Sequence, residues 1–334
     1  MKIKRERQNV NKKSAGVCLI QRLHSFSFII FAVTLSLFVA SPTYAALKIE
    51  AVHLYDLQGP TKDSRFRNHN AVLCDPERNE MYVVDTGNGC IRIFGKEGLQ
   101  IFQFENDDLS LPLSVALNDL GDIYVLQSGS GGRSIKVFDF RGKYLSQLKL
   151  QGLPDGDSVM PEAIAIDSRN TVYVSDPKHG RLLAFDSEGR LKFTITPEMS
   201  EKDREEVIFG NLMIDKEDRV YLPVSTLGTI LVFDSQGQLV TNFGIKGGGP
   251  GKLAFPVDVV ADNRGRMLVL DKQRHCISVF DSQGNYQTEF GGMGISPGWF
   301  FFPSGLEIDR YGRLYVSQRY GDKVQVLKVK EVVE

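Results

Sequence analysis

The chain has 334 residues, of which 42% are hydrophobic and 24% are charged, and this composition excludes a disordered protein. The first 45 residues hold 7 of the 40 basic and 1 of the 41 acidic residues, so the remainder carries a net charge of −7. A remainder this acidic argues against nucleic-acid binding, which requires a basic surface.

Residues 1–45 have the pattern of a secretory signal peptide. A basic leader precedes the uncharged segment "FSFIIFAVTLSLFVA" at 26–40, and "SPTYA" then places small residues at Thr43 and Ala45, where signal peptidase reads. The apolar run of 15 residues is shorter than the roughly 20 that span a bilayer. We expect cleavage near Ala45 and a periplasmic or secreted protein without a membrane span. A retained membrane anchor is the alternative.

Six repeats of about 47 residues follow the leader. The segment "ILVFDSQGQLVTNFG" at 230–244 returns as "ISVFDSQGNYQTEFG" at 277–291. The Phe of this motif recurs at spacings of 44, 47, 48 and 47 residues, at Phe94, Phe138, Phe185, Phe233 and Phe280. Each repeat contains four β-branched or aromatic runs, separated by turn sequences such as "NRG" and "SQG". Four-stranded repeats of this length predict a β-propeller.

We therefore predict an all-β fold, a six-bladed β-propeller of four-stranded blades. The segment "LKIEAVHLYDL" at 47–57 is expected to pair into the last blade, because this would close the ring and remove an open sheet edge. The single domain is expected at 46–334, with blades at about 69–104, 112–149, 161–195, 208–244, 256–291 and 303–330. Helical periodicity is confined to 197–208, where one short surface turn is expected.

The repeat unit resembles a known one. Its pattern "P-x-x-[IV]-A-x-D-x-x-G-x-x-Y-V-x-D", followed by "V-F-D-x-x-G", is similar to the NHL repeat of six-bladed propellers, here as an exported bacterial member. The resemblance covers essentially all of the chain after the leader. It implies the fold but no single function, because members of this family range from binding scaffolds to enzymes.

Two glycine-rich linkers, 243–256 and 290–303, connect the last three repeats. A phosphate-binding loop is disfavoured there, since Lys246 and Leu253 occupy positions where that motif needs Gly and Ser or Thr. A structural role is expected instead, in which linker aromatic residues pack between the blades. These packing residues are Phe255, Phe302 and Trp299.

Polar residues near the start of the first strands are expected at the mouth of the central channel. They are Asn70, Ser114, Glu162, Asn211, Asp258 and Ser304, with Glu307 further in. The set loosely resembles the Glu/Asn/Asp groups with which gluconolactonase-like and paraoxonase-like propellers bind one divalent cation. Any water-filled channel also places polar residues there. Ca²⁺ is therefore the one candidate cofactor, with Asn70, Glu162, Asn211, Asp258 and Glu307 as candidate ligands.

Acidic residues end the second strand in three repeats, at Asp85, Asp176 and Asp271, and Gln318 takes this place in the last. Each Asp is expected to accept backbone N–H bonds from the turn that follows it. A ring of carboxylates that binds Ca²⁺ is the alternative. A three-histidine zinc site, as in related propeller lyases, is disfavoured because the histidines are not close in sequence.

The turns between second and third strands give one face of the ring a polar and basic character. The candidate binding residues on this face are Arg133, His179, Arg274, His275, Arg319 and Tyr320. No catalytic set is recognisable, and no catalytic residue is assigned. The leading hypothesis is an exported non-enzymatic scaffold that presents this face to a protein, peptide or glycan of the cell envelope. The alternative is a metal-dependent hydrolase or lyase, gluconolactonase-like or propeller-lyase-like, acting at the central channel.

Overall fold

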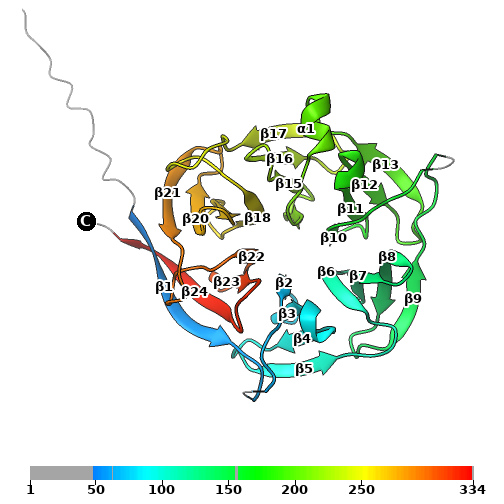
Figure 1. The fold of residues 1–334 in the computed structure, drawn as a ribbon, viewed down its shortest axis with the longest axis horizontal. Coiled ribbons are helices and arrows are strands. Elements are labelled where there is room, and N and C mark those ends of the chain that lie inside the picture. Colours follow the sequence, from blue (N-terminus) through cyan, green and yellow to red (C-terminus); the bar gives the residue numbers. More distant parts are fainter. Residues whose placement is uncertain (1–47, 62, 155–156, 333–334) are drawn as a thin grey trace, which may run out of the picture. The chain divides into compact units, whose positions relative to one another are not determined.

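Twenty-four strands of the described chain form six antiparallel sheets of four strands each. The computed structural model describes residues 48–61, 63–154 and 157–332, so the predicted signal peptide lies outside the described residues. Figure 1 shows the sheets as blades around a central axis, with the first strand of each blade innermost. The predicted six-bladed, four-stranded all-β propeller is confirmed.

The strands are short, and most have five to seven residues. Blade 1 consists of β2 (His69–Asp75), β3 (Glu80–Asp85), β4 (Cys90–Phe94) and β5 (Gln100–Phe104). Blade 2 consists of β6 (Leu111–Leu117), β7 (Ile123–Gly129), β8 (Gly132–Phe138) and β9 (Tyr144–Leu148). Blade 3 consists of β10 (Ile164–Ile166), β11 (Val172–Asp176), β12 (Arg181–Phe185) and β13 (Leu191–Ile195). Blade 4 consists of β14 (Met213–Ile214), β15 (Val220–Val224), β16 (Thr229–Phe233) and β17 (Leu239–Phe243). Blade 5 consists of β18 (Pro256–Ala261), β19 (Met267–Asp271), β20 (Cys276–Phe280) and β21 (Tyr286–Gly291). Blade 6 consists of β22 (Pro303–Ile308), β23 (Arg313–Gln318), β24 (Val324–Val332) and β1 (Lys48–Leu57).

Aspartate turns end these strands. In blade 5 the Oδ1 atom of Asp281 accepts hydrogen bonds from the backbone N–H groups two and four residues later, both at 2.9 Å. Gly284 then adopts a φ of 80°, a left-handed conformation that suits glycine. The "SQG" sequence therefore makes a tight connection between third and fourth strands, as its composition predicts.

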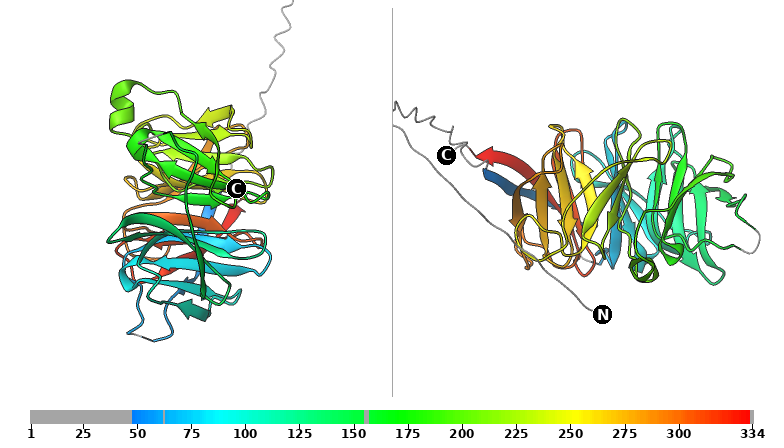
Figure 2. Two further views of the ribbon diagram at one scale, coloured as in Figure 1. Left: turned by 90° about the vertical axis from the view of Figure 1, so that its right-hand side faces the viewer. Right: turned by 90° about the horizontal axis from the view of Figure 1, so that it is seen from above.

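The ring is closed by the two ends of the described chain. Strand β1 pairs antiparallel with β24 as the outer strand of blade 6, with Glu50 opposite Lys330 and Ala51 opposite Val329. Figures 1 and 2 show the two strands side by side at the outer edge of that blade. The predicted closure by the segment after the leader is confirmed, and it supplies a partner for the exposed edge of β24.

Hydrophobic clusters fill the spaces between neighbouring blades, and six of them occur in the described chain. In the linkers the fully buried residues are Leu253 and Phe300. The sequence had indicated Phe255 and Phe302, two positions later, and these are half-buried. Trp299, expected to pack between blades, is 49% exposed and lies against the backbone of Gly292. The linker folds back on itself, which turns these three side chains toward the surface.

Regular helix is minor in this fold. The predicted surface turn is α1 (Glu201–Glu205), whose N-cap Ser200 accepts the backbone N–H of Asp203, and two 3₁₀ turns are present, η1 (Thr86–Asn88) and η2 (Pro177–His179). No helix in the described part of the chain is long and apolar enough to cross a membrane. Cys74, Cys90 and Cys276 are free thiols.

Antiparallel connection places two kinds of loop on one face of the ring. The linkers between blades and the turns between second and third strands lie on this side, which we call the linker face. The turns from first to second and from third to fourth strands lie on the other side, the opposite face. All six candidate binding residues belong to the linker face.

Candidate binding site on the linker face

Side chains at the ends of the second strands hold the linkers in place. Asp271 accepts the backbone N–H of Ala254 at 2.6 Å and of Phe255 at 3.1 Å, and it also accepts from two turn N–H groups. Equivalent bonds to the linker N–H groups are accepted by Asp85, Gln127, Asp176 and Gln318. Each of these Asp residues was expected to accept backbone N–H groups from the turn that follows its strand. Among the described residues such bonds are found for Asp271 but not for Asp85 or Asp176. Because these side-chain oxygens accept backbone N–H groups of the linkers, they make the linker face rigid.

Two of the candidate binding residues are buried within that scaffold. The side chain of Arg274 is 11% exposed and donates to Glu289 at 2.6 Å and to two carbonyl groups of the preceding linker. His275 is 8% exposed, and its Nδ1 accepts the backbone N–H of Phe302 at 3.2 Å. Both side chains anchor linkers and are not presented to solvent.

Two further candidates pair within the chain. Arg133 donates through Nη1 to the Pro161 carbonyl at 2.7 Å and to Glu162 at 3.1 Å, which joins blade 2 to blade 3. The Nδ1 atom of His179 lies 2.7 Å from a carboxylate oxygen of Asp176. These bonds fix the turns, and they occupy Nη1 of Arg133 and Nδ1 of His179.

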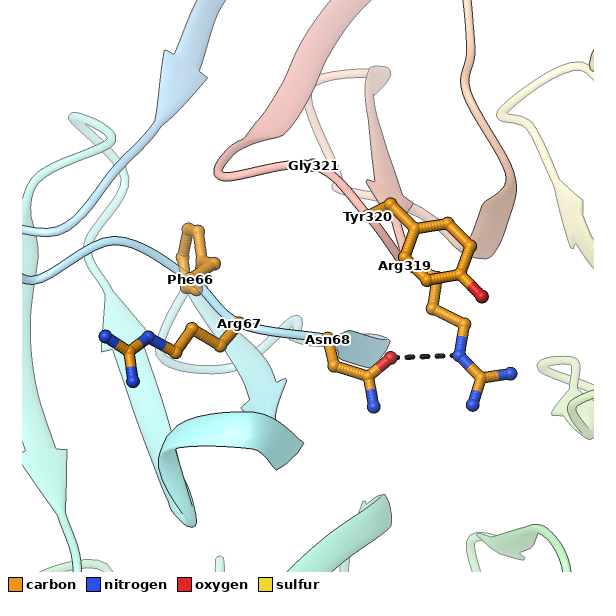
Figure 3. A pocket seen from close by; sticks show the side chains of 6 residues that line it. All are labelled: Phe66, Arg67, Asn68, Arg319, Tyr320 and Gly321. Carbon is orange, nitrogen blue, oxygen red and sulfur yellow. Dashed lines mark hydrogen bonds between the residues drawn. The ribbon is translucent and has the colours of Figure 1, made fainter.

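Arg319 and Tyr320, the remaining candidates, line a shallow pocket of about 370 Å³ between blades 6 and 1. Its lining is Phe66, Arg67, Asn68, Arg319, Tyr320 and Gly321. Arg319 donates through Nε to Oδ1 of Asn68 at 2.9 Å, and Tyr320 is 67% exposed (Figure 3). Figure 3 also shows the Arg67 and Arg319 side chains diverging from each other, so the two cations of the pocket are separated.

Backbone conformation marks the same region. Asn68, His275 and Phe302 have φ values of 52°, 57° and 50°, in the left-handed region. This conformation is unusual for a bulky aromatic residue such as Phe302, and such strain is concentrated at functional sites. The Phe302 ring makes edge contacts with His275 and Tyr320, at centroid distances of 5.2 and 5.4 Å. The strained backbone of Phe302 thus places an aromatic ring against Tyr320, beside Arg319.

The channel residues form a hydrogen-bonded network rather than an open cation site. Buried Asp258 accepts the amide of Asn211 at 2.8 Å and the backbone N–H groups of Leu306 and Val259 at 2.9 and 2.8 Å. The Asn211 amide also donates to the Ser304 carbonyl at 3.2 Å. Asp258 therefore joins blades 4, 5 and 6 near the axis.

Two channel carboxyls have raised pKa values. Burial raises the pKa of Asp258 to about 7 against the effect of its hydrogen bonds. Burial, with a smaller effect of the Asp258 charge, raises the pKa of Glu307 to about 8. The described residues contain no group of three or more His, Cys, Asp or Glu side chains arranged to hold a metal ion. Of the remaining predicted ligands, Glu162 pairs with Arg133 and Asn70 is half-buried in β2.

Sequence reasoning missed Lys272, which follows Asp271 just as Arg319 follows Gln318. The backbone N–H groups of Lys272 and Arg319 both bond the carbonyl seventeen residues earlier, at 3.0 Å, so the two positions are equivalent. Thr86 and Ser225 occupy the equivalent positions in blades 1 and 4. The signal was available in the sequence, because two adjacent repeats place a cation where other repeats have a hydroxyl.

Comparison with known proteins agrees with this architecture. The model of the DUF5128 family, described as a 6-bladed beta-propeller, matches residues 252–328. The human E3 ubiquitin-protein ligase NHLRC1 is 31% identical over 126 residues, which are 37% of this chain and 29% of that protein. The chain is an NHL-like six-bladed β-propeller. This NHL-like propeller thus spans less than a third of the curated relative, and the activity of that whole protein does not follow from the match.

Solved structures share the fold of this NHL-like propeller at low identity. An auxiliary nutrient binding protein of Bacteroides thetaiotaomicron superposes with a TM-score of 0.63 at 17% identity, over 85% of this chain and 77% of that one. Virginiamycin B lyase of Staphylococcus aureus superposes with a TM-score of 0.55 at 12% identity, over 84% of this chain and 99% of that one. Both show the fold alone, because identities this low do not carry a function.

Proposed function

We propose that this NHL-like propeller is an exported, non-enzymatic binding module that presents its linker face to a protein, peptide or glycan of the cell envelope. Export is proposed from the signal pattern at 1–45. The observation that carries the binding role is the pocket of Arg67, Asn68, Arg319 and Tyr320, on a face whose linkers are fixed by hydrogen bonds. A binding scaffold is also consistent with structural neighbours such as nutrient binding proteins.

The geometry supports binding rather than bond cleavage. Arg133, His179 and Arg274 bond carboxylates or backbone of the chain itself, and the buried channel carboxyl Asp258 is held by three N–H donors. Arg319 and Tyr320 instead extend into solvent at the pocket. A rigid pocket with exposed cationic and aromatic groups suits recognition, since little conformational freedom of the side chains is lost when a ligand binds.

The test probes glycan and peptide arrays of envelope polymers with the full chain and two variants. Arg319→Glu reverses the charge in the pocket. Arg141→Glu makes the same change at an exposed arginine in the β8–β9 turn, on the opposite face. We expect binding to fall by about tenfold or more in Arg319→Glu, because a charged hydrogen bond is lost, and to persist in Arg141→Glu.

The chemical state of the ligand separates binding from catalysis. Mass spectrometry should recover the bound ligand unchanged after long incubation with the full chain. A ligand of altered mass would contradict the non-enzymatic proposal. Equal binding by wild type and Arg319→Glu would assign recognition to another surface.

A further inference from the structure

Short hydroxyl side chains join neighbouring blades at one repeated position on the linker face. Thr86 in blade 1 donates through Oγ1 to the carbonyl of Pro112 at 2.6 Å. Ser225 in blade 4 donates through Oγ to the carbonyl of Pro256 at 2.5 Å. In each case the acceptor lies at or next to the start of the first strand of the next blade, so the hydroxyl has a structural role.

Lys272 and Arg319 replace that hydroxyl in two adjacent blades, 5 and 6. The Lys272 side chain is half-buried, and its ammonium group bonds no described residue. Burial, and then the positive charge of Arg319, lower the pKa of Lys272. The two cations therefore repel each other, neither pairs with a carboxylate among the described residues, and Lys272 is also partly removed from water. This arrangement costs stability unless an anion lies between them.

The Arg319 guanidinium is oriented for a carboxylate. Its Nε donates to Oδ1 of Asn68, which fixes the plane of the group. The two Nη atoms have no partner in the described chain. Parallel donation from a fixed guanidinium fits the two oxygens of a carboxylate, and a nearby ammonium adds charge without a second directional requirement.

Aromatic and amide groups stand beside these cations. The exposed Tyr320 ring follows Arg319 in the same turn, and Phe302 packs edge-on against it. Asn68 keeps its Nδ2 donors free of partners among the described residues, while its Oδ1 accepts from Arg319. A flat aromatic surface, an amide donor and a cation pair match a ring that carries both hydroxyl groups and a carboxylate.

We propose that this pocket binds an acidic carbohydrate, a sugar ring bearing a carboxylate. The carboxylate binds the two free Nη atoms of Arg319, the sugar ring packs on Tyr320, and a ring hydroxyl accepts from Asn68, while Lys272 of blade 5, outside the pocket lining, adds positive charge. An extended peptide fits less well, because the residues that line this pocket lie in loops and turns and offer no strand edge for it to pair with. This inference rests on the proposed binding function and names its ligand class.

The experiment measures binding of a galacturonic acid hexamer to the full chain by calorimetry at low salt. The matched ligand is the fully methyl-esterified hexamer, which keeps the ring and loses the charge. The variants are Lys272→Ser, which restores the residue of blade 4, and Arg319→Gln. The control is Arg141→Gln on the opposite face. Inorganic phosphate is titrated alone and as a competitor.

We expect the acidic hexamer to bind about tenfold or more tightly than its ester. Each pocket variant should lose about the same factor with no fall in melting temperature, because one of two repelling cations is removed, and Arg141→Gln should bind as wild type does. Equal affinity for acid and ester would overturn the inference, as would unchanged affinity in both pocket variants. Phosphate binding as tightly as the hexamer would also overturn it, since the sugar would then contribute nothing.

The two proposals fail in different ways. An array that shows only neutral glycans or peptides bound through Arg319 would overturn the acidic sugar and leave the binding function standing. An array with no ligand that depends on Arg319, or a ligand of altered mass, would remove the proposed function itself.

Discussion

Single carboxyls at the central channel are expected to set how the centre of this ring responds to pH. Glu307 lies on β22 beside Asp258, and its Oε1 accepts the backbone N–H of Ile308 at 2.9 Å. Its pKa of about 8 exceeds the ordinary value of 4.5, so the folded chain keeps this proton over a pH range in which the unfolded chain releases it. The stabilisation is fully present below about pH 4.5 and is lost as the pH rises through about 8.

Glu307→Gln tests this at the scale of one residue. The amide does not titrate, so the variant should lose less stability than wild type as the pH rises from 6 to 9. Between pH 6 and pH 9 the melting temperature of the variant should fall by about 2 °C or more less than that of wild type, measured by circular dichroism. Asp258 titrates with the same sign in both proteins, and His69, whose pKa burial lowers to about 4, has the opposite sign below pH 6.5. Parallel curves would mean that Glu307 is charged in the folded chain.

The sequence predicted the contacts of individual side chains less well than it predicted the fold. Repeat position correctly placed Arg274 and His275 in the second-to-third-strand turn. It did not show that the preceding linker folds over Arg274, because that contact depends on tertiary packing. The sequence did not point to Lys272, Arg67 and Asn68. These residues are distant from Arg319 along the chain, and only the closed ring brings blades 5, 6 and 1 together.

At the scale of elements, the linkers are rigid because each is hydrogen-bonded to the end of the second strand in the blade that follows it. Asp271 is fully buried and accepts four backbone N–H groups, two from the linker and two from the turn. Blade 4 has Val224 in this position, and Thr226 instead accepts the linker N–H of Ile208 at 3.4 Å. The sequence predicted the Asp-ended strands but not the linker bonds, whose donors lie about seventeen residues upstream.

Asp271→Ala should therefore loosen the linker 244–255 and destabilise the chain. We expect a loss of about 3 kcal/mol in the free energy of unfolding, since four backbone N–H donors lose their buried acceptor. The control is Asp281→Ala, which removes two backbone and two side-chain hydrogen bonds at a more exposed site and should cost about 1 kcal/mol or less. Urea unfolding measures both values. A similar cost for the two variants would show that the linker is not held by Asp271.

At the scale of the whole molecule, the pocket at Arg319 is a product of ring closure. Arg319 and Tyr320 come from blade 6, and Phe66, Arg67 and Asn68 come from the linker between β1 and blade 1. The pairing of β1 with β24 fixes both sides of this seam. The repeat spacing predicted the number of blades and the closing strand, because period and strand count are properties of the sequence. It did not predict a pocket at the seam, because the two sides lie some 250 residues apart.

The central claim is that β1 completes blade 6 in the observed register, and a pair of engineered cysteines tests it most directly. Glu50 and Lys330 are exposed and opposite each other on β1 and β24, so Glu50→Cys with Lys330→Cys places two thiols within disulfide range. Glu50→Cys with Val329→Cys places them on opposite faces of the sheet. Peptide mapping of the oxidised full chain should find the 50–330 disulfide in nearly all molecules and the 50–329 disulfide in few. Absence of the first, or equal yields of the two, would contradict the closure and the pocket that depends on it.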